Sequence, residues 1–261
     1  MEPRLSFSNA ELLQRVETIA LEAGRLVMEV YATEFAVDSK EDASPVTLAD
    51  QRAEALIVDA LHALAPDIPI VAEELAAAGC VPDIGNRFWL VDPLDGTREF
   101  IKRNGEFTVN VALIENGHPV LGIVCAPALG TVYAGAAAGP AYMRSSAGTD
   151  VLRCRTVPAE GLTVVASASH GDVAALDAFL AGRRVAARRA IGSSLKLCLL
   201  AAGAADLYPR FGRTMEWDIA AGHAVLVAAG GSVTDLAGAP LRYGKPGFEN
   251  PAFVARGLAA C

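Results

Sequence analysis

The sequence predicts a layered fold of helices and sheets, of the α/β or α+β class. Segments with helical periodicity alternate along the chain with short apolar segments that are typical of strands, and such alternation indicates layers. The 261 residues are 52% hydrophobic and 20% charged, which is too apolar for a disordered chain. Because the pattern changes near residue 150, we expect an N-terminal α+β subdomain over residues 1–150 and a C-terminal α/β subdomain over residues 151–261.

Two helices are expected at the N-terminal end. Residues 9–33 place apolar side chains at helical spacing, and Asn9 can cap this helix. Residues 34–47 are polar and predict a loop or an edge hairpin. The helical spacing returns over residues 47–64, and Pro66 ends this second helix.

Five apolar segments then predict the strands of the first subdomain. They lie at residues 68–72, 88–91, 108–114, 120–125 and 131–135. The segment Phe88–Val91 is continuously apolar, as expected of a strand that is buried on both faces. Asn116-Gly117 predicts a hairpin turn between the third and fourth strands.

Beyond residue 150, short strands alternate with short helices. We expect strands at residues 164–167, 183–190, 206–209 and 232–235, and helices at residues 173–180, 195–202 and 217–229. Gly192-Ser193-Ser194 precedes the second of these helices, and Gly203 ends it. The four arginines between residues 183 and 189 predict a solvated strand or an interface. The strand at 232–235 is expected to be the last, because a Gly/Pro-rich tail follows it.

Charge and cysteine content narrow the possible classes of function. A net charge of −8 argues against a general nucleic-acid binder, which usually carries a basic face. The five cysteines form no close pair, so we expect buried free thiols in a reducing compartment. The N-terminus lacks the pattern of a signal peptide, and no run of ~18 apolar residues occurs. We therefore expect a soluble cytoplasmic protein without a membrane span, which leaves peripheral membrane association open.

The most informative segment is Asp92-Pro93-Leu94-Asp95-Gly96-Thr97, at the end of a buried strand. Pro93 restricts the backbone and Gly96 permits a tight turn, so both carboxylates can point to one side and leave the Leu94 carbonyl exposed. Oxygen ligands of this kind suit Mg²⁺. Asp-Pro and Asp-Gly are also common turn formers, and the spacing alone leaves both interpretations open.

Two further carboxylates favour a metal site. Glu73 follows a predicted strand and Asp218 opens a predicted helix. Four converging carboxylates would repel one another without cations, and two Mg²⁺ ions would offset their formal charge of −4. Such a pair of metal ions is typical of sites for displacement at phosphorus.

Four motifs carry a resemblance to a known family. They are Val46-Thr47-Leu48-Ala49-Asp50, Ala72-Glu73-Glu74, Asp92-Pro93-Leu94-Asp95-Gly96-Thr97 and Trp217-Asp218-Ile219-Ala220-Ala221-Gly222. In order and spacing they resemble the motifs of the inositol monophosphatase superfamily, which comprises lithium-sensitive, Mg²⁺-dependent phosphatases. The resemblance covers roughly residues 10 to 250. It implies a layered αβαβα sandwich of the inositol monophosphatase and fructose-1,6-bisphosphatase type, with the metals between its halves.

Within that superfamily, three segments are similar to the CysQ branch. They are residues 97–110, Gly192-Ser193-Ser194-Leu195-Lys196 and Leu207-Tyr208-Pro209-Arg210. CysQ enzymes are 3′(2′),5′-bisphosphate nucleotidases that remove the 3′-phosphate of adenosine 3′,5′-bisphosphate, a by-product of sulfate assimilation. The usual member has Lys where this chain has Arg98, a change that preserves the charge.

The resemblance implies a role for each acidic residue. Glu73, Asp92 and the Leu94 carbonyl would hold one Mg²⁺, and Asp92, Asp95 and Asp218 a second, with two or three ions in the whole site. The catalytic residues would be Asp50, Thr97 and Glu73, with the Thr97 hydroxyl oriented by Asp50. For Asp50 the alternative is capping of a helix N-terminus, because it follows Thr47 closely.

The resemblance also implies the residues that bind a small nucleotide substrate. They are Glu73, Leu94, Asp95, Gly96, Thr97, His170, Ser193, Lys196, Arg210 and Asp218, and Arg213 is a further candidate for the second phosphate. On the bare sequence Lys196 would be a solvated surface lysine, and His170 a surface or capping histidine. Glu74 would point away from the site if its segment is extended.

Several alternatives stay open. The same fold would serve inositol monophosphate, fructose 1,6-bisphosphate or histidinol phosphate as substrate. A non-catalytic nucleotide- or Mg²⁺-binding regulator would lack a metal ligand or Thr97, and this chain keeps them all. A serine nucleophile is disfavoured, because Ser193-Ser194 lacks a Gly-x-Ser-x-Gly context. The sequence leaves the oligomeric state open between monomer and homodimer.

Overall fold

The computed structural model describes residues 8–33, 45–167 and 173–258. Its helices are α1 (Asn9–Tyr31), α2 (Pro45–Leu64), α3 (Glu73–Ala77), α4 (Thr97–Ile101), α5 (Val173–Leu180), α6 (Leu195–Ala201) and α7 (Glu216–Ala228), with 3₁₀ turns at Pro127–Leu129 and Pro246–Phe248. A seven-stranded sheet contains β1 (Ile70–Ala72), β2 (Arg87–Asp95), β3 (Thr108–Glu115), β4 (His118–Ala126), β5 (Thr131–Ala136), β6 (Tyr142–Ser145) and β7 (Gly148–Val151), in that spatial order. A five-stranded sheet has the order β11 (Ser232–Asp235), β12 (Phe253–Arg256), β10 (Leu207–Arg210), β8 (Leu162–Ser167) and β9 (Val185–Ile191).

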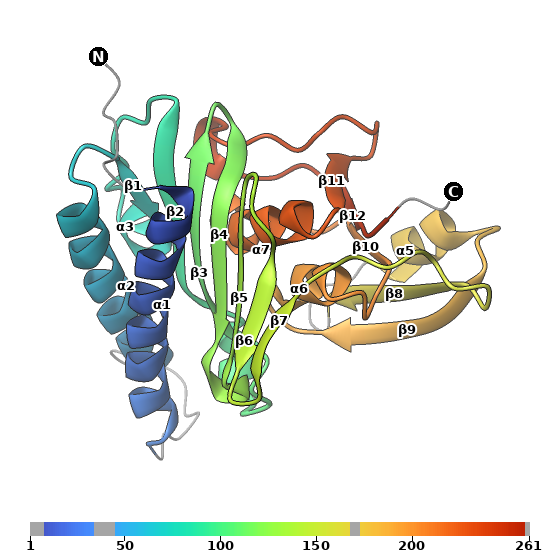
Figure 1. Cartoon of the computed structure of the whole chain (residues 1–261), viewed down its shortest axis with the longest axis horizontal. Coiled ribbons are helices and arrows are strands. Elements are labelled where there is room, and N and C mark those ends of the chain that lie inside the picture. The colour runs from blue at the N-terminus through green and yellow to red at the C-terminus, as the bar shows by residue number, and fades with distance from the viewer. Residues whose placement is uncertain (1–7, 34–44, 168–172, 259–261) are drawn as a thin grey trace.

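These elements form five layers (Figure 1). Helices α1 and α2 pack together and cover one face of the seven-stranded sheet, and α7 covers the other face. Helices α6 and α7 separate that sheet from the five-stranded sheet, whose far face packs against Leu176, Phe179 and Leu180 of α5. The order of layers is αβαβα, which confirms the predicted fold class.

The two sheets come from separate parts of the chain, residues 70–151 and 162–256. Helix α7, however, belongs to the C-terminal part and packs on β3, β4 and β5 of the first sheet. The division of the chain into two subdomains at residue 150 stays a prediction.

The beginnings of the first two helices differ from the expectation. Ser8, not Asn9, caps α1: the Glu11 amide donates to the Ser8 hydroxyl at 3.3 Å, and the Ser8 amide donates to the Glu11 carboxylate at 2.9 Å. This reciprocal pair is a capping box. Helix α2 begins at Pro45, a residue that is favoured in the first turn. Asp50 therefore lies beyond the first turn, and the alternative that it caps the helix is wrong.

Three strands escaped the sequence analysis. The hairpin β6–β7 is largely exposed and mixed in composition, so it shows no alternation of apolar residues. Strand β12 lies in the Gly/Pro-rich tail and pairs with β10 and β11, so the expectation that residues 232–235 form the last strand is wrong. Its residues Phe253, Val254 and Ala255 are fully buried, which a four-residue run cannot reveal.

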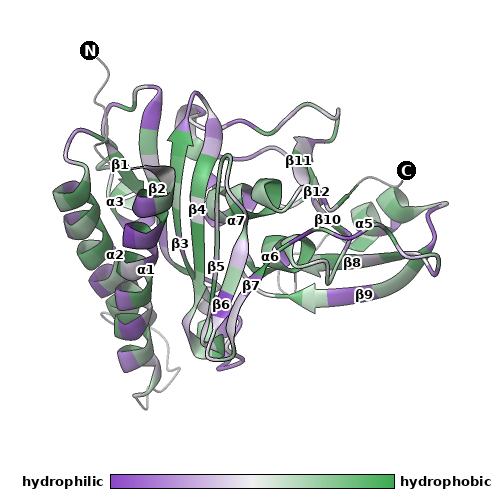
Figure 2. Cartoon of the chain, in the orientation of Figure 1, coloured by the Kyte–Doolittle hydropathy of each residue, from purple (hydrophilic) through white to green (hydrophobic). Residues whose placement is uncertain are grey.

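Hydrophobic residues concentrate along the strands of the first sheet and along α7 (Figure 2). Cys125, Cys154 and Cys198 are buried free thiols, as predicted, whereas the free thiol of Cys80 is exposed, contrary to the expectation. Within the described ranges, no helix combines the length and the apolar character that crossing a membrane requires.

Candidate active site

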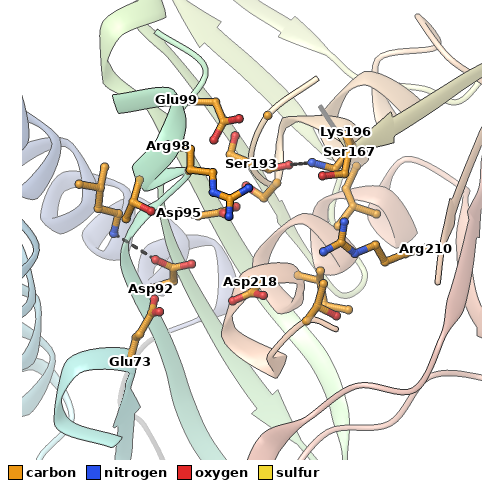
Figure 3. A pocket seen from close by; sticks show the side chains of 18 of the residues that line it. Glu73, Asp92, Asp95, Arg98, Glu99, Ser167, Ser193, Lys196, Arg210 and Asp218 are labelled. Carbon is orange, nitrogen blue, oxygen red and sulfur yellow. Dashed lines mark hydrogen bonds between the residues drawn. The ribbon is translucent and has the colours of Figure 1, made fainter. Parts of the chain in front are cut away.

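A cavity of about 300 Å³ opens between the two sheets. Figure 3 shows Glu73, Asp92 and Asp95 toward one side of it and Lys196 and Arg210 toward the other, with Arg98 beside Asp95. Its lining residues are Glu73, Asp92, Leu94, Asp95, Gly96, Thr97, Arg98, Glu99, Ser167, Gly192, Ser193, Ser194, Lys196, Leu197, Tyr208, Arg210, Arg213, Thr214, Asp218 and Ile219. Segments far apart in the sequence thus meet at one place.

The end of β2 provides the centre of the carboxylate side. The register between β2 and β3 shifts between Asp92 and Asp95, and such irregularities re-aim side chains. The Leu94 amide donates to Asp92 Oδ1 at 3.0 Å, which fixes the Asp92 carboxylate. Gly96 then adopts a φ of 95°, and a Cβ there would lie 3.1 Å from the Glu106 carbonyl oxygen. Glycine therefore permits the turn that places Thr97 at the start of α4.

Two other elements bring carboxylates to the same cavity. Strand β1 runs parallel to β2, with Ala72 opposite Val91, so both strands end at the same edge of the sheet. Glu73 follows at once as the first residue of α3. Asp218 lies in the first turn of α7, where it accepts a hydrogen bond from the Met215 amide at 2.8 Å.

Burial shifts the titration of these carboxylates. It raises the pKa of Glu73 to about 7, although a hydrogen bond with the Asp92 carboxyl opposes the shift. It also raises the pKa of Asp218 to about 8, with a further contribution from the charge of Asp95. The pKa of Asp92 is raised well above its ordinary value by burial and by the charges of Glu73 and Asp95. The cluster therefore disfavours its own negative charge, the condition in which bound cations stabilise a site.

Asp50 lies behind this cluster rather than in the cavity wall. It is 5% exposed on α2. Burial, followed by the charges of Glu74, Glu73 and Glu54, raises its pKa to about 8. Its charge in turn raises the pKa of Asp92.

Four basic residues line the cavity. Arg98 follows Thr97 in α4, whereas Lys196, Arg210 and Arg213 form a cationic side. Lys196 is 6% exposed. Its ammonium donates to the Ile191 carbonyl at 3.2 Å and to the Ser193 carbonyl. Arg210 donates to the carbonyls of Gly212 and Arg213, at 3.1 and 2.9 Å. Burial lowers the pKa of Lys196 to about 8, and the charge of Asp95 opposes this shift.

The donor set suits a hard divalent cation. It consists of carboxylate oxygens from Glu73, Asp92, Asp95 and Asp218 and the backbone of Leu94. In the part of the chain that the structure describes, no three carboxylate, histidine or cysteine side chains stand close enough together to enclose an ion by themselves. Backbone oxygen, water and a substrate phosphate would complete each site, which is how Mg²⁺ is usually held.

The sequence model of the inositol monophosphatase family matches residues 8–260. The chain belongs to the inositol monophosphatase family. It is 48% identical over 245 residues to the 3′(2′),5′-bisphosphate nucleotidase CysQ of Shigella flexneri, and the alignment covers 93% of this chain and 98% of that protein. The protein of the same name from Escherichia coli strain K12 is 47% identical, with the same coverage. Among solved structures, CysQ from Bacteroides thetaiotaomicron, a bacterial member of this family, superposes with a TM-score of 0.83 at 35% identity, covering 97% of this chain and 99% of that chain.

Most of the residues that the family resemblance singled out line this one cavity. They are Glu73, Asp92, Leu94, Asp95, Gly96, Thr97, Ser193, Lys196, Arg210 and Asp218. His170 lies outside the described residues. Lys196 is buried, so the alternative of a solvated surface lysine is wrong. The premise that Glu74 lies in an extended segment is also wrong, because Glu73 and Glu74 form the first turn of α3.

A polar group beneath the cavity was not predicted from the sequence. Asn110, on β3, lies 3.4 Å from the Asp95 carboxylate and accepts a hydrogen bond from the Ser194 hydroxyl at 2.8 Å. Ser194 also contacts the Thr108 hydroxyl at 3.0 Å. These contacts join the first sheet to the loop before α6. An asparagine inside an apolar strand was the signal that could have revealed them.

Proposed function

We propose that this chain is a Mg²⁺-dependent 3′(2′),5′-bisphosphate nucleotidase. It would hydrolyse the 3′-phosphate of adenosine 3′,5′-bisphosphate to yield AMP and phosphate. It would also hydrolyse the 3′-phosphate of the analogue that carries a phosphosulfate at the 5′ position, and both reactions would serve sulfur assimilation. The observation that carries the proposal is the cavity itself, because carboxylates for cations and four basic side chains line one space. The CysQ relatives support the choice of a bisphosphorylated nucleotide.

Two or three Mg²⁺ ions would be held by the carboxylate side. Glu73, Asp92 and the Leu94 carbonyl would hold one, and Asp92, Asp95 and Asp218 another. When bound there, Mg²⁺ supplies positive charge for the phosphate oxygens and lowers the pKa of an attacking water. Asp92 would be the shared ligand, and its hydrogen bond from the Leu94 amide keeps its carboxylate in place.

Thr97 and Asp50 would handle the proton of the attacking water. Thr97 lines the cavity at the start of α4, where its hydroxyl can accept a hydrogen bond from water. Asp50 has a raised pKa and a field that reaches the cluster, so it can hold a proton close to neutral pH. The amides of Gly96 and Thr97 would donate to the phosphate.

The cationic side would recognise the second phosphate and the nucleoside. Ser193, Lys196 and Arg210 line this side, and Arg213 lies at its rim with an ion pair to Glu249 at 3.0 Å. A charge-assisted hydrogen bond contributes about 1.5–3 kcal/mol, so one or two of them would separate a bisphosphate from a monophosphate.

A panel of phosphate esters tests this assignment. Phosphate release would be measured with Mg²⁺ from adenosine 3′,5′-bisphosphate, inositol 1-phosphate, fructose 1,6-bisphosphate and histidinol phosphate. We expect the highest kcat/KM for the nucleotide, by a wide margin. An equal or higher kcat/KM for inositol 1-phosphate would overturn the substrate assignment, although the protein would still be a phosphatase.

A further inference from the structure

The short helix that carries Glu73 has no cap of its own. Helix α3 contains five residues, and its N-cap residue, Ala72, has no side chain that can accept a hydrogen bond. The first amides of a helix need partners, and so short a helix is not stable in isolation. The position of Glu73 therefore depends on a group from elsewhere in the chain.

Glu54 of α2 supplies that group. Its Oε2 accepts a hydrogen bond from the Glu74 amide at 2.8 Å, and its Oε1 accepts one from the Leu75 amide at 3.0 Å. The side chain is 4% exposed, so these charge-assisted bonds form away from water. Both carboxylate oxygens are engaged in holding the first turn of α3.

Glu73 lies between two fixed points as a result. On one side, Ala72 is paired with Val91 in the sheet. On the other, the next two amides are bound to Glu54. Glu54 does not line the cavity, so it acts on the site through Glu73 and not by contact with a substrate. Asp50 lies one turn earlier on the same helix, so α2 serves the site twice.

We propose that Glu54 is a positioning residue for divalent cation binding, because it holds the turn that presents Glu73. This inference rests on the proposed function, in which Glu73 is a Mg²⁺ ligand. Groups that orient metal ligands from behind typically change metal affinity about 10–100-fold when they are removed. Glu54 should therefore matter to Mg²⁺ affinity although it makes no contact with the ion.

The test is calorimetric titration of Mg²⁺ into the full chain, freed of metal by chelation and dialysis. We expect Glu54→Ala to bind Mg²⁺ about tenfold more weakly than the wild type. Glu54→Gln keeps one acceptor oxygen and should lose less. If the two variants lose equally, the charge of Glu54 matters rather than its hydrogen bonds, and the inference is overturned.

Glu17 offers a matched control. It is a glutamate that is 3% exposed, on α1, where Tyr142 donates to it at 2.7 Å and Arg144 pairs with it at 3.0 Å. Glu17→Ala removes comparable buried contacts away from the cavity. It should lower the thermal midpoint of unfolding without changing Mg²⁺ affinity.

Hydrogen exchange of the metal-free protein reports on the positioning itself. The amides of Glu74 and Leu75 should lose protection in Glu54→Ala and keep it in Glu17→Ala. Protected amides or wild-type Mg²⁺ affinity in a folded Glu54→Ala protein would overturn the inference. If Glu54→Ala does not fold, wild-type Mg²⁺ affinity in Glu54→Gln would overturn it. Failure of the proposed function has a different signature, because the wild type itself would then bind no Mg²⁺.

Discussion

At the scale of single residues, Asp92 is the side chain on which the proposed metal site depends most. It is 1% exposed, and the negative charges of Glu73 and Asp95 both raise its pKa. Asp92→Asn keeps the size of the side chain but removes the charge that two cations would share. We expect kcat to fall well beyond tenfold, which is more than ~1.4 kcal/mol of transition-state stabilisation. A folded variant that keeps over a tenth of wild-type kcat would show that Asp92 is not the shared ligand.

A substitution of Lys196 tests recognition of the nucleotide separately from the phosphate hydrolysis that all substrates share. Its ammonium lies beside the cavity and also binds the Ile191 and Ser193 carbonyls. Removal of a charged partner costs about 1.5–3 kcal/mol, so Lys196→Ala should lower kcat/KM for adenosine 3′,5′-bisphosphate some tenfold to hundredfold. Turnover of inositol 1-phosphate should change little, because that substrate does not reach the cationic side. Equal losses for both substrates would assign Lys196 to the loop that it ties rather than to the nucleotide.

The buried carboxylates predict how stability varies with pH in the metal-free protein. The folded-state pKa values of Glu73, Asp50 and Asp218 are raised to about 7, 8 and 8, above those of the unfolded chain. The folded state then holds more protons than the unfolded state, so stability falls as pH rises through these values. The thermal midpoint of unfolding, measured in chelator, should drop between pH 6.5 and 8.0. Buried His223, whose pKa is lowered to about 3, acts in the opposite direction, but at pH values below this window. Asp50→Asn should make the drop smaller. A thermal midpoint that rises over this window would show that the pKa values of these carboxylates are not raised.

At the scale of elements, the close approach of α7 to the first sheet depends on glycine. A Cβ on Gly122 of β4 would lie 2.2 Å from the Ala221 carbonyl oxygen and 2.8 Å from the Ala224 Cβ. Backbone atoms cannot move aside as a flexible side chain can, and overpacking of this kind costs about 1–3 kcal/mol or more. Gly122→Ala should lower the free energy of unfolding by at least that amount in denaturant titrations. Gly85→Ala is the control, because no atom of the described residues lies within 4 Å of its Cβ position, and it should stay within about 0.5 kcal/mol of the wild type.

Most elements could be predicted from periodicity, because their length or apolar content exceeds that of a turn. Helix α1 and strands β2 to β4 are examples, and the chain forms them where expected. Helix α3 could not be predicted, since its first turn depends on Glu54, which is remote in sequence. Strand β12 depends likewise on its neighbours in the sheet. For the site, the motifs indicated the carboxylates and Lys196, whereas Asn110 and Glu54 act through packing that spacing does not encode.

At the scale of the whole molecule, the cavity exists because the two sheets face each other across α6 and α7. The first sheet brings Asp92 and Asp95, and α7 adds Asp218 from the C-terminal part of the chain. The cationic side comes from α6, which carries Lys196, and from the end of β10 and the loop after it, which carry Arg210 and Arg213. Each half of the chain therefore holds only part of the site.

The central claim is cation-dependent removal of the 3′-phosphate from a nucleoside bisphosphate by this composite site. The measurement that tests it most directly is chromatographic product analysis. Adenosine 3′,5′-bisphosphate is incubated with protein kept free of metal by a chelator, before and after Mg²⁺ is restored. We predict no turnover in chelator, and with Mg²⁺ equal amounts of phosphate and AMP, in which the 5′-phosphate is kept. Full turnover in excess chelator, or adenosine 3′-phosphate as the product, would contradict the account.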